Sequence, residues 1–287
     1  MIILDGKNTA QKIVNNLKIE LEKYPSKPRL DIILVGDDPA SLQYDEMKQR
    51  KAAEIGINGE IHHLAQDSTT TQVISLVERL NNDNQVTAFM IQLPLPPQID
   101  TSIVLNTIDP KKDADGLTST NLGLLFQKKP EAIASATPLG VVKLLEEYNI
   151  DVSGKNTVII GRSHFIGLPL LALLLGKNST VTICHSYTKD LQNICKNADI
   201  LITSAGKSKL ITKDFVKNGA IVIDVGLSSD LESGKLVGDV DFEAVSQVAS
   251  FITPVPGGVG PMTIAALISN TVEIFKKNNI TTTKYEQ

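Results

Sequence analysis

Short apolar runs alternate with amphipathic helical patterns along most of the chain. The run Leu30–Val35 reads LDIILV, which is apolar and rich in β-branched residues, as expected of a buried strand. Pro39 then opens a helix with Asp38 as its expected N-cap, and this helix ends before Gly56. The same order of strand and helix is repeated through the rest of the sequence.

The pattern predicts the remaining elements by their residue ranges. Strands are expected at 57–63, 86–93, 157–160, 180–183, 200–203 and 220–225. Helices are expected at 69–80, 137–148, 166–175, 189–196, 213–216 and after Pro261. The runs TVII and AIVIDV lack polar alternation, which is typical of parallel strands covered on both faces. The chain is therefore predicted to be an α/β protein with parallel sheets.

A break in this alternation near residues 120–137 predicts two domains. We expect an N-terminal α/β domain of residues 1–136 and a C-terminal Rossmann-like domain of residues 137–261. The final helix, residues 262–287, has no strand after it, so we expect it to pack on the first domain.

Composition narrows the class of protein. The chain has 287 residues, 42% hydrophobic and 21% charged, which are ordinary globular values and exclude a disordered chain. A net charge of −4 argues against a nucleic-acid partner. The longest apolar runs are too short for a membrane span, and the N-terminus does not have the pattern of a signal peptide. Two cysteines do not form a disulfide scaffold, so a cytoplasmic location is expected.

A glycine-containing turn follows the run TVII. It reads Gly161-Arg162-Ser163, and Gly167 then opens the apolar segment LPLLALLL. Such a turn between a strand and a helix exposes backbone N–H groups at the helix N-terminus, where a pyrophosphate binds well. The spacing departs from GxGxxG, so an ordinary strand-to-helix turn with glycines for packing also fits it.

The cofactor expected at this turn is NADP. A site for NAD carries an acidic residue about 20 residues further on, which holds the ribose 2′-hydroxyl. The next strand ends in Cys184-His185-Ser186, without a carboxylate. Arg162 supplies a cation and Ser186 a hydroxyl, and this pair suits a 2′-phosphate. The alternative for Arg162 is a solvated surface arginine. The alternative for His185 is a polar residue whose hydrogen bonds are satisfied at the end of a strand.

Tyr44 and Lys48 lie four residues apart on the helix that begins at Pro39, so they share one face. A tyrosine hydroxyl beside an amine can relay a proton. A lysine acts as a base near pH 7 only where burial or a nearby cation lowers its pKa from about 10.4. An exposed helix face gives the same spacing, and Lys51 is a further basic residue on this helix.

Gln92 and the pair Asp113 and Asp115 are further polar candidates. Gln92 follows the apolar strand VTAFMI at the carboxyl end, beyond which α/β sheets bind ligands, and it can orient a lysine or a substrate amide. A buried carboxylate at Asp115 would bind adjacent N–H donors of a heterocycle. The alternative for Gln92 is a residue at a strand end that caps backbone groups. The alternative for the two aspartates is a solvated charged turn.

A loop with three glycines and three prolines, residues 254–263, precedes the final helix and lets a ligand approach the backbone. No metal site is expected. His62 and His63 are adjacent and point to opposite sides of a strand, and Cys184 and Cys195 have no ligand partners nearby.

These motifs occur in the order found in a known family. They are Tyr44-x-x-x-Lys48, Gln92-Leu-Pro-Leu-Pro96, Lys112-Asp113-x-Asp115-Gly116, Gly161-Arg-Ser163, Cys184-His-Ser186, Asp224-Val-Gly226 and Pro256-Gly-Gly-Val-Gly-Pro-Met-Thr263. Over nearly its whole length the chain resembles the bacterial, FolD-type bifunctional 5,10-methylenetetrahydrofolate dehydrogenase / 5,10-methenyltetrahydrofolate cyclohydrolase. The resemblance implies an N-terminal folate-binding catalytic domain, a C-terminal NADP-binding domain, an active site in the cleft between them, and a homodimer.

The resemblance also implies two reactions and the residues that perform them. Methylenetetrahydrofolate is oxidised to the methenyl form with NADP, and hydrolysis then gives 10-formyltetrahydrofolate. Lys48 would transfer the proton, and the catalytic set would be Lys48, Tyr44, Gln92 and Asp115. Substrate contacts are implied for Tyr44, Lys48, Gln92, Leu93, Asp115, Pro256, Gly257, Gly258 and Val259. Cofactor contacts are implied for Gly161, Arg162, Ser163, Ser186 and Leu227.

The chain departs from the family pattern in two places. Ala136 stands where the family often has a cysteine, and Asp45 stands where an apolar residue is common. These departures concern the balance of the two activities. Two alternatives remain: a monofunctional dehydrogenase of the same family, and a nucleotide-binding module without turnover.

Overall fold

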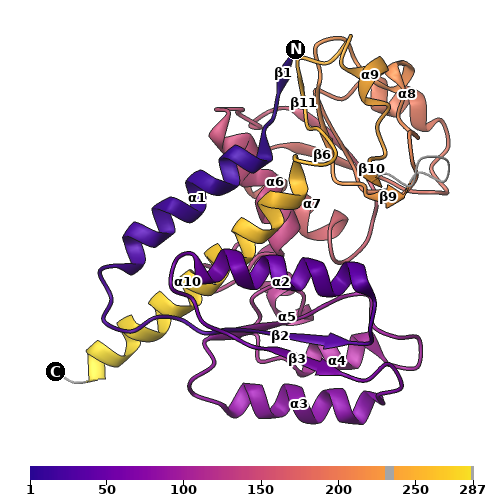
Figure 1. The fold of residues 1–287 in the computed structure, drawn as a ribbon. Coiled ribbons are helices and arrows are strands. Elements are labelled where there is room, and N and C mark those ends of the chain that lie inside the picture. The colour runs from indigo at the N-terminus through magenta and orange to yellow at the C-terminus, as the bar shows by residue number, and fades with distance from the viewer. Residues whose placement is uncertain (230–235, 286–287) are drawn as a thin grey trace. The chain divides into compact units, whose positions relative to one another are not determined.

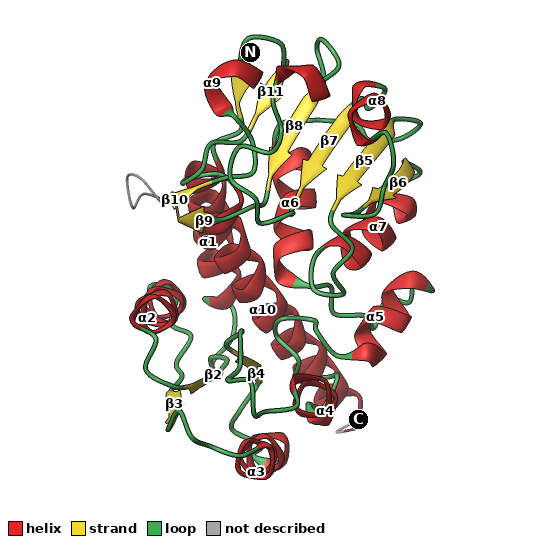
Figure 2. Cartoon of the chain, turned by 90° about the vertical axis from the view of Figure 1, so that its right-hand side faces the viewer, coloured by secondary structure: helices red, strands yellow, loops and turns green. Residues whose placement is uncertain are grey.

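The computed structural model describes residues 1–229 and 236–285. It divides into two compact units, and each contains a parallel sheet: unit 1 (residues 1–11 and 137–263) and unit 2 (residues 12–136 and 264–287). The predicted α/β fold with two domains is confirmed (Figures 1 and 2).

The first residues of the chain belong to unit 1, although the sequence analysis placed them in the first domain. Strand β1 (Ile2–Ile3) extends the sheet of unit 1 by pairing in parallel with β11 (Phe251–Ile252). Helix α1 (Gly6–Leu21), which the sequence analysis did not predict, follows it. The Asp5 carboxylate accepts a hydrogen bond from the Asn8 N–H at 2.9 Å in the first turn of this helix. The chain passes from unit 1 to unit 2 inside α1.

Unit 2 contains a three-stranded parallel sheet in the order β3-β2-β4. Its strands are β2 (Leu30–Val35), β3 (Ile61–Leu64) and β4 (Ala88–Ile91). Strand β2 is central and buried over its whole length, which accounts for its unbroken apolar pattern. Figure 1 shows α2 (Pro39–Ala53) and α3 (Thr70–Asn82) on opposite faces of this sheet.

Both of these helices begin where their capping residues predict. The Asp38 carboxylate accepts a hydrogen bond from the Ser41 N–H at 2.8 Å at the start of α2. Thr69 and Gln72 form a capping box at the start of α3. The predicted apolar stripe of α3 is buried and consists of Val73, Leu76, Val77 and Leu80.

Two short helices and most of the last helix complete unit 2. They are α4 (Thr101–Thr107), α5 (Ser119–Phe126) and α10 (Val259–Tyr285). From Ile264 onward α10 belongs to unit 2. The side-chain amide of Asn270 on this helix donates hydrogen bonds at 2.9 Å to the carbonyl oxygens of Ala114 and Ala134. The last helix therefore fixes the loop that carries Asp115.

Unit 1 contains a six-stranded parallel sheet in the order β1-β11-β8-β7-β5-β6. Its other strands are β5 (Asn156–Ile160), β6 (Thr180–Cys184), β7 (Ile200–Thr203) and β8 (Ile221–Asp224). After β5 the chain forms β6 on one side of it and then returns to form β7 on the other side. This reversal is a topological switch point, and ligands of α/β sheets bind beyond the carboxyl ends of the strands there.

Helices and a small antiparallel ribbon accompany this sheet (Figure 2). They are α6 (Ala136–Glu147), α7 (Gly167–Gly176), α8 (Leu191–Lys196), α9 (Phe242–Val245), and the strands β9 (Ser228–Ser229) and β10 (Leu236–Val237). One sheet face, including Val158, Leu201 and Val222, forms a core with apolar residues of α8 and α9. Helix α7 packs on β5 and β6. The helix expected at 213–216 is a single 3₁₀ turn, Lys213–Phe215.

A buried ion cluster lies at the start of β2. The Asp31 carboxylate has no exposed surface, and it accepts two hydrogen bonds of 2.8 Å from the Arg29 guanidinium. Arg29 binds both carboxylate oxygens, and His62 Nε2 on β3 contacts one of them, Asp31 Oδ2, at 2.7 Å. Burial acts to raise the pKa of Asp31, but the hydrogen bonds from Arg29 and His62 outweigh burial and hold the pKa below its usual value.

Replacing Asp31 by alanine is expected to lower the free energy of unfolding by about 2–4 kcal/mol at pH 7, because Arg29 and His62 lose a buried partner. The ionised carboxylate stabilises the fold above its unfolded pKa of about 3.8, and this stabilisation is lost as the pH falls through the lower folded pKa. Urea unfolding between pH 7 and pH 3 measures both effects. A loss of the same size at every pH would contradict the electrostatic explanation.

Candidate functional site

Helix α2 places two of the predicted residues beside each other. It follows β2 directly, so its first turns lie near the carboxyl edge of the three-stranded sheet. Lys48 is only 3% exposed, and its Nζ lies 4.6 Å from the centroid of the Tyr44 ring. Burial, together with the charges of Asp115 and Asp45, raises the pKa of the Tyr44 hydroxyl. The burial of Lys48 excludes the alternative of a solvated helix face.

Two side chains bind the Lys48 amine. Its Nζ lies 2.6 Å from Gln92 Oε1 and 2.8 Å from Asp45 Oδ1. The amide of Gln92 has a fixed orientation, because its Nε2 donates a hydrogen bond to the Leu93 carbonyl at 2.6 Å. The Gln92 N–H continues the pairing of β4 with β2 by donating to the Ile33 carbonyl at 2.8 Å. The structure thus brings Gln92 to Lys48, as predicted.

Asp45 is completely buried on the same helix. Burial raises the pKa of Asp45, and the Lys48 amine opposes this rise. Its Oδ1 contacts Lys48, whereas its Oδ2 is buried and has no hydrogen-bond partner among the described residues. From the sequence, this aspartate is recognisable only as a departure from the family pattern.

Asp113 forms the turn that carries Asp115. The segment 112–114 runs beside β4, because the Phe89 N–H donates to the Lys112 carbonyl at 2.9 Å and the Ala114 N–H donates to the Phe89 carbonyl at 3.1 Å. The Asp113 carboxylate is 1% exposed. It accepts hydrogen bonds from Leu117 N, Thr118 N and Asn121 Nδ2. Asp113 is therefore a structural residue of this turn.

Asp115 has a different environment. It is half-buried, and the Ala136 N–H, which donates to the Asp115 carbonyl at 3.1 Å, is the one hydrogen-bond donor that acts on its carboxyl group among the described residues. Burial raises the pKa of Asp115 to about 7; the Lys48 charge lowers it, whereas the Asp113 and Asp45 charges raise it further. Unit 2 thus brings an available carboxyl group, Asp115, close enough to Lys48 for their charges to interact.

The glycine turn of unit 1 lies between β5 and α7. Gly161 has a φ of +130°, and a Cβ there would lie 2.3 Å from Ser204 Oγ. A Cβ on Gly167 would lie 2.1 Å from the Gly161 carbonyl oxygen. Both positions therefore require glycine. The N-cap of α7, Ile166, has no side-chain capping bond, although the Ser163 hydroxyl accepts a hydrogen bond from the Ile166 N–H at 3.1 Å.

The other expected cofactor residues follow neighbouring strands of the same sheet. Arg162 follows β5, Ser186 follows β6 and Leu227 follows β8, and all three side chains are exposed. Because these strands are parallel, the residues share the carboxyl edge of the sheet. The Arg162 guanidinium lies 5.9 Å from the centroid of the Tyr187 ring. His185 Nδ1 accepts a hydrogen bond from the Tyr187 N–H at 3.2 Å, so this histidine is satisfied locally.

The glycine-proline loop also belongs to unit 1, because it follows β11. Along Pro256–Val259 the chain passes from an exposed proline to a buried valine. The Lys7 N–H donates a hydrogen bond to the Gly257 carbonyl at 3.1 Å. A Cβ on Gly6 would lie 1.7 Å from the Gly258 carbonyl oxygen, so the start of α1 closes tightly on this loop. The loop and the residues around Lys48 thus belong to different units.

Two residues of this site were not predicted from the sequence. Asp45 contacts Lys48, and Asn270 holds the loop of Asp115 through its two carbonyl bonds. The sequence contains one indication for each residue. For Asp45 it is a carboxylate three residues before Lys48, and for Asn270 it is an amide within the apolar run AALISNTV. Both required knowledge of which helix faces are buried.

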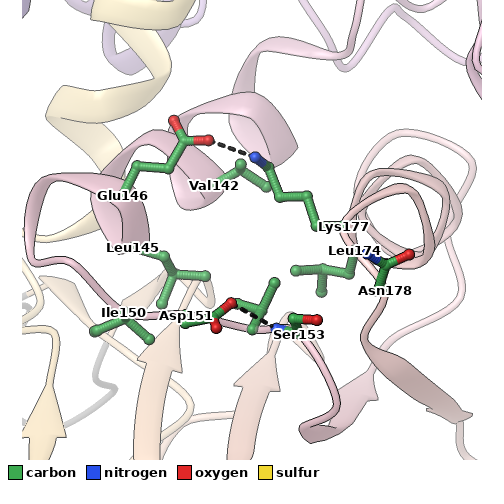
Figure 3. Close-up of a pocket in the computed structure, with 10 residues that line it drawn as sticks. Val142, Leu145, Glu146, Ile150, Asp151, Ser153, Leu174, Lys177 and Asn178 are labelled. Carbon is green, nitrogen blue, oxygen red and sulfur yellow. Dashed lines mark hydrogen bonds and ion pairs between the residues drawn. The ribbon is translucent and has the colours of Figure 1, made fainter.

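The structure contains a pocket that includes none of the predicted residues. It lies in unit 1 between α6 and α7 and has a volume of about 360 Å³ (Figure 3). An ion pair between Glu146 Oε1 and Lys177 Nζ spans 2.5 Å beside it, and the Asp151 carboxylate accepts a hydrogen bond from the Ser153 N–H at 2.9 Å. These polar groups satisfy one another, so we assign no chemistry to this pocket.

Where the structure describes the side chains (residues 1–228 and 236–279), no cluster of three or more histidine, cysteine, aspartate or glutamate residues is arranged to hold a metal ion. No helix within residues 1–229 and 236–285 is both long enough and apolar enough to cross a bilayer.

Comparison with known proteins identifies the family. Residues 4–115 match the catalytic domain of tetrahydrofolate dehydrogenase/cyclohydrolase, and residues 135–279 match the NAD(P)-binding domain of the same family. A relative from Nautilia profundicola, named bifunctional protein FolD, is 48% identical over 279 residues, which cover 96% of this chain and 98% of the relative.

Solved structures agree with this match. A bifunctional FolD methylenetetrahydrofolate dehydrogenase/cyclohydrolase from Campylobacter jejuni is 45% identical and superposes with a TM-score of 0.94, covering 97% of this chain and 99% of that one. The enzyme from Trypanosoma brucei, solved with NADP and an inhibitor, is 35% identical with a TM-score of 0.91, covering 97% and 98%. This chain belongs to the tetrahydrofolate dehydrogenase/cyclohydrolase family of bifunctional FolD proteins.

Proposed function

We propose that this enzyme oxidises 5,10-methylenetetrahydrofolate with NADP and then hydrolyses the methenyl product through Lys48. The family supplies the two reactions. The assignment of roles rests on one observation: the Lys48 amine is buried and contacts Gln92 Oε1 at 2.6 Å, beside the Tyr44 ring. A buried amine held by hydrogen bonds is the arrangement that proton transfer at a fixed point requires.

In the hydrolytic step Lys48 acts on water. The water oxygen forms a bond to the methenyl carbon, one O–H bond of that water breaks, and its proton passes to the lone pair of a neutral Lys48 Nζ. A carbon–nitrogen bond of the ring then breaks: the leaving nitrogen takes the electron pair and a proton from the Lys48 ammonium, the hydroxyl proton passes to solvent, and 10-formyltetrahydrofolate remains. Gln92 orients the amine, and the Tyr44 hydroxyl, whose raised pKa keeps it protonated, remains a hydrogen-bond donor.

Asp115 is proposed to bind the pterin. Its carboxylate is available for a ligand, whereas Asp113 is occupied by three donors of its own turn. An ionised carboxylate that accepts two adjacent N–H groups of a heterocycle gives a strong and specific contact. Leu93 and the Pro256–Val259 loop are proposed as further folate contacts on the basis of the family resemblance alone.

The residues of the glycine turn fit a dinucleotide. When bound, the nicotinamide ring accepts the hydride of the first reaction. The close backbone approach at Gly161 and the N-terminus of α7 suit a pyrophosphate. Exposed Arg162 and Ser186 suit a 2′-phosphate, and they support NADP over NAD. Ser163 and Leu227 are proposed to line the same site.

A homodimer and a cytoplasmic location are further proposals that follow from the resemblance. The two alternative functions differ in simple assays. A monofunctional dehydrogenase would produce NADPH without hydrolysing methenyltetrahydrofolate, and a binding module would do neither.

Replacing Lys48 by alanine is expected to reduce the cyclohydrolase rate at least about 100-fold, because the base is lost, while NADP still binds. The decay of methenyltetrahydrofolate absorbance measures the rate, and a fluorescence titration measures NADP binding. Lys51→Ala on the same helix is the matched control and should retain activity. Normal hydrolysis by the Lys48 variant would refute the role given to this residue.

Binding of tetrahydrofolate is expected to strengthen as the pH rises through about 7, where Asp115 ionises. In a Lys48→Met variant the attraction of the amine is lost, so the pKa of Asp115 rises and the binding curve moves to higher pH. Calorimetric titrations between pH 5.5 and 8.5 measure this shift. An Asp115→Asn variant should give a flat curve, and a flat curve for the unmodified enzyme would contradict the assignment.

Replacing Arg162 by alanine is expected to weaken NADP binding about 10-fold or more and NAD binding much less, because only NADP presents a 2′-phosphate to the guanidinium. The ratio of kcat/KM for the two cofactors measures this change. Lys189→Ala, another exposed cation after β6, serves as the control. Equal losses for NADP and NAD would show that Arg162 does not read the 2′ position.

A further inference from the structure

Asp45 is the most unusual group beside the proposed base. A carboxylate with no exposed surface is rare unless it is paired, and here the pairing is to the Lys48 amine at 2.8 Å. The other carboxylate oxygen, Oδ2, has no partner among the described residues and almost no accessible surface. A ligand therefore does not reach this oxygen, and the interaction of Asp45 with the rest of the site passes through Lys48.

The geometry at Nζ shows what this contact does. A lysine nitrogen has three positions besides its carbon, and two of them face Asp45 Oδ1 and Gln92 Oε1. These two contacts leave one position for the proton that the base accepts. Gln92 is neutral and orients the amine in either protonation state. Asp45 carries a charge when ionised, so it favours the ammonium form over the neutral amine.

Other titratable groups face this pair from two elements. Tyr44 lies on α2 itself, with its ring 4.6 Å from Nζ. Asp115 lies on the loop after α4, where its charge interacts with both Lys48 and Asp45, and Asp113 stands next to it in that loop. Asp115 is not in contact with the amine by hydrogen bond, and Tyr44 is held in its neutral form. Asp45 is therefore the charged group in direct contact with the base.

We propose that Asp45 is a positioning residue that holds Lys48 as an ammonium ion in the resting enzyme and so sets the pH range of the hydrolytic step. The inference rests on the proposed role of Lys48 as the base. An ammonium ion has no lone pair for the proton of water, so the step begins only after Lys48 releases a proton to solvent. When water then adds to the methenyl carbon, its proton returns the amine to the ammonium form, and Asp45 balances that charge.

The test is the pH profile of kcat/KM for hydrolysis of methenyltetrahydrofolate. Replacement of Asp45 by asparagine or valine removes the charge. The acid limb of the profile, where kcat/KM falls as the pH is lowered, is therefore expected to shift to lower pH by about one unit or more. Asp45→Glu retains the charge and should leave the limb closer to its original position. Glu54→Gln removes an exposed acid at the C-cap of α2 that pairs with Lys51 at the same spacing, and it should leave the profile unchanged.

The outcomes separate this inference from the proposed function. If the unmodified enzyme does not hydrolyse the substrate, or if Lys48→Ala retains full hydrolysis, the proposed function itself fails. If both enzymes behave as proposed but the limb of Asp45→Asn and Asp45→Val stays in place, the role of Asp45 alone is refuted. A structural role would lower the rate of these variants at every pH without moving the limb.

A second measurement needs no variant of Asp45. In ¹⁵N-lysine-labelled enzyme, the Lys48 signal is assigned by its loss in Lys48→Met. An ammonium signal at pH 7 in the unliganded enzyme supports the proposal. A neutral amine signal at that pH would overturn it, whether or not the Asp45 variants fold.

Discussion

The burial of a lysine amine is the constraint on which unit 2 depends. A cation removed from water requires acceptors at fixed positions, and here Asp45 and Gln92 supply them. The position of Gln92 depends on the pairing of β4 with β2, because its own N–H continues that ladder to Ile33. A slip of one residue in this register would turn the glutamine to the other face of the sheet and leave the amine with a single partner. The sheet register and the charged pair therefore support each other.

The two carboxylates of the Lys-Asp-Ala-Asp-Gly segment show how one short loop combines structure and chemistry. Asp113 uses its oxygens to hold the backbone of the turn and the side chain of Asn121. Asp115, two residues later, is only half-buried and has the backbone N–H of Ala136 as a donor, in place of the three donors that surround Asp113. The sequence gives both residues the same chemical identity, and only the fold distinguishes the aspartate that holds the loop from the one that the loop presents.

The sequence was sufficient where local patterns decide the structure. The continuous apolar run of β2, the cap at Asp38 and the stripe of α3 are local features, and the structure reproduces them. The strands β1 and β11 are two residues long and exist only through pairing with distant segments, so no local pattern identifies them. Periodicity placed Tyr44 and Lys48 on one face of a helix, but it did not show that Asp45 is buried beside Lys48. That burial is set by the elements that pack on α2, which are remote in the sequence.

The amide of Asn270 has a consequence for the order in which the enzyme is made. A ribosome releases the chain from its N-terminus, and early segments begin to fold before later ones exist. The Ala114 carbonyl beside Asp115 and the Ala134 carbonyl beyond α5 are joined only by the amide of residue 270. A nascent chain can thus form the central sheet of unit 2 early, but the loop that carries Asp115 is fixed in place only after residue 270 has been synthesised.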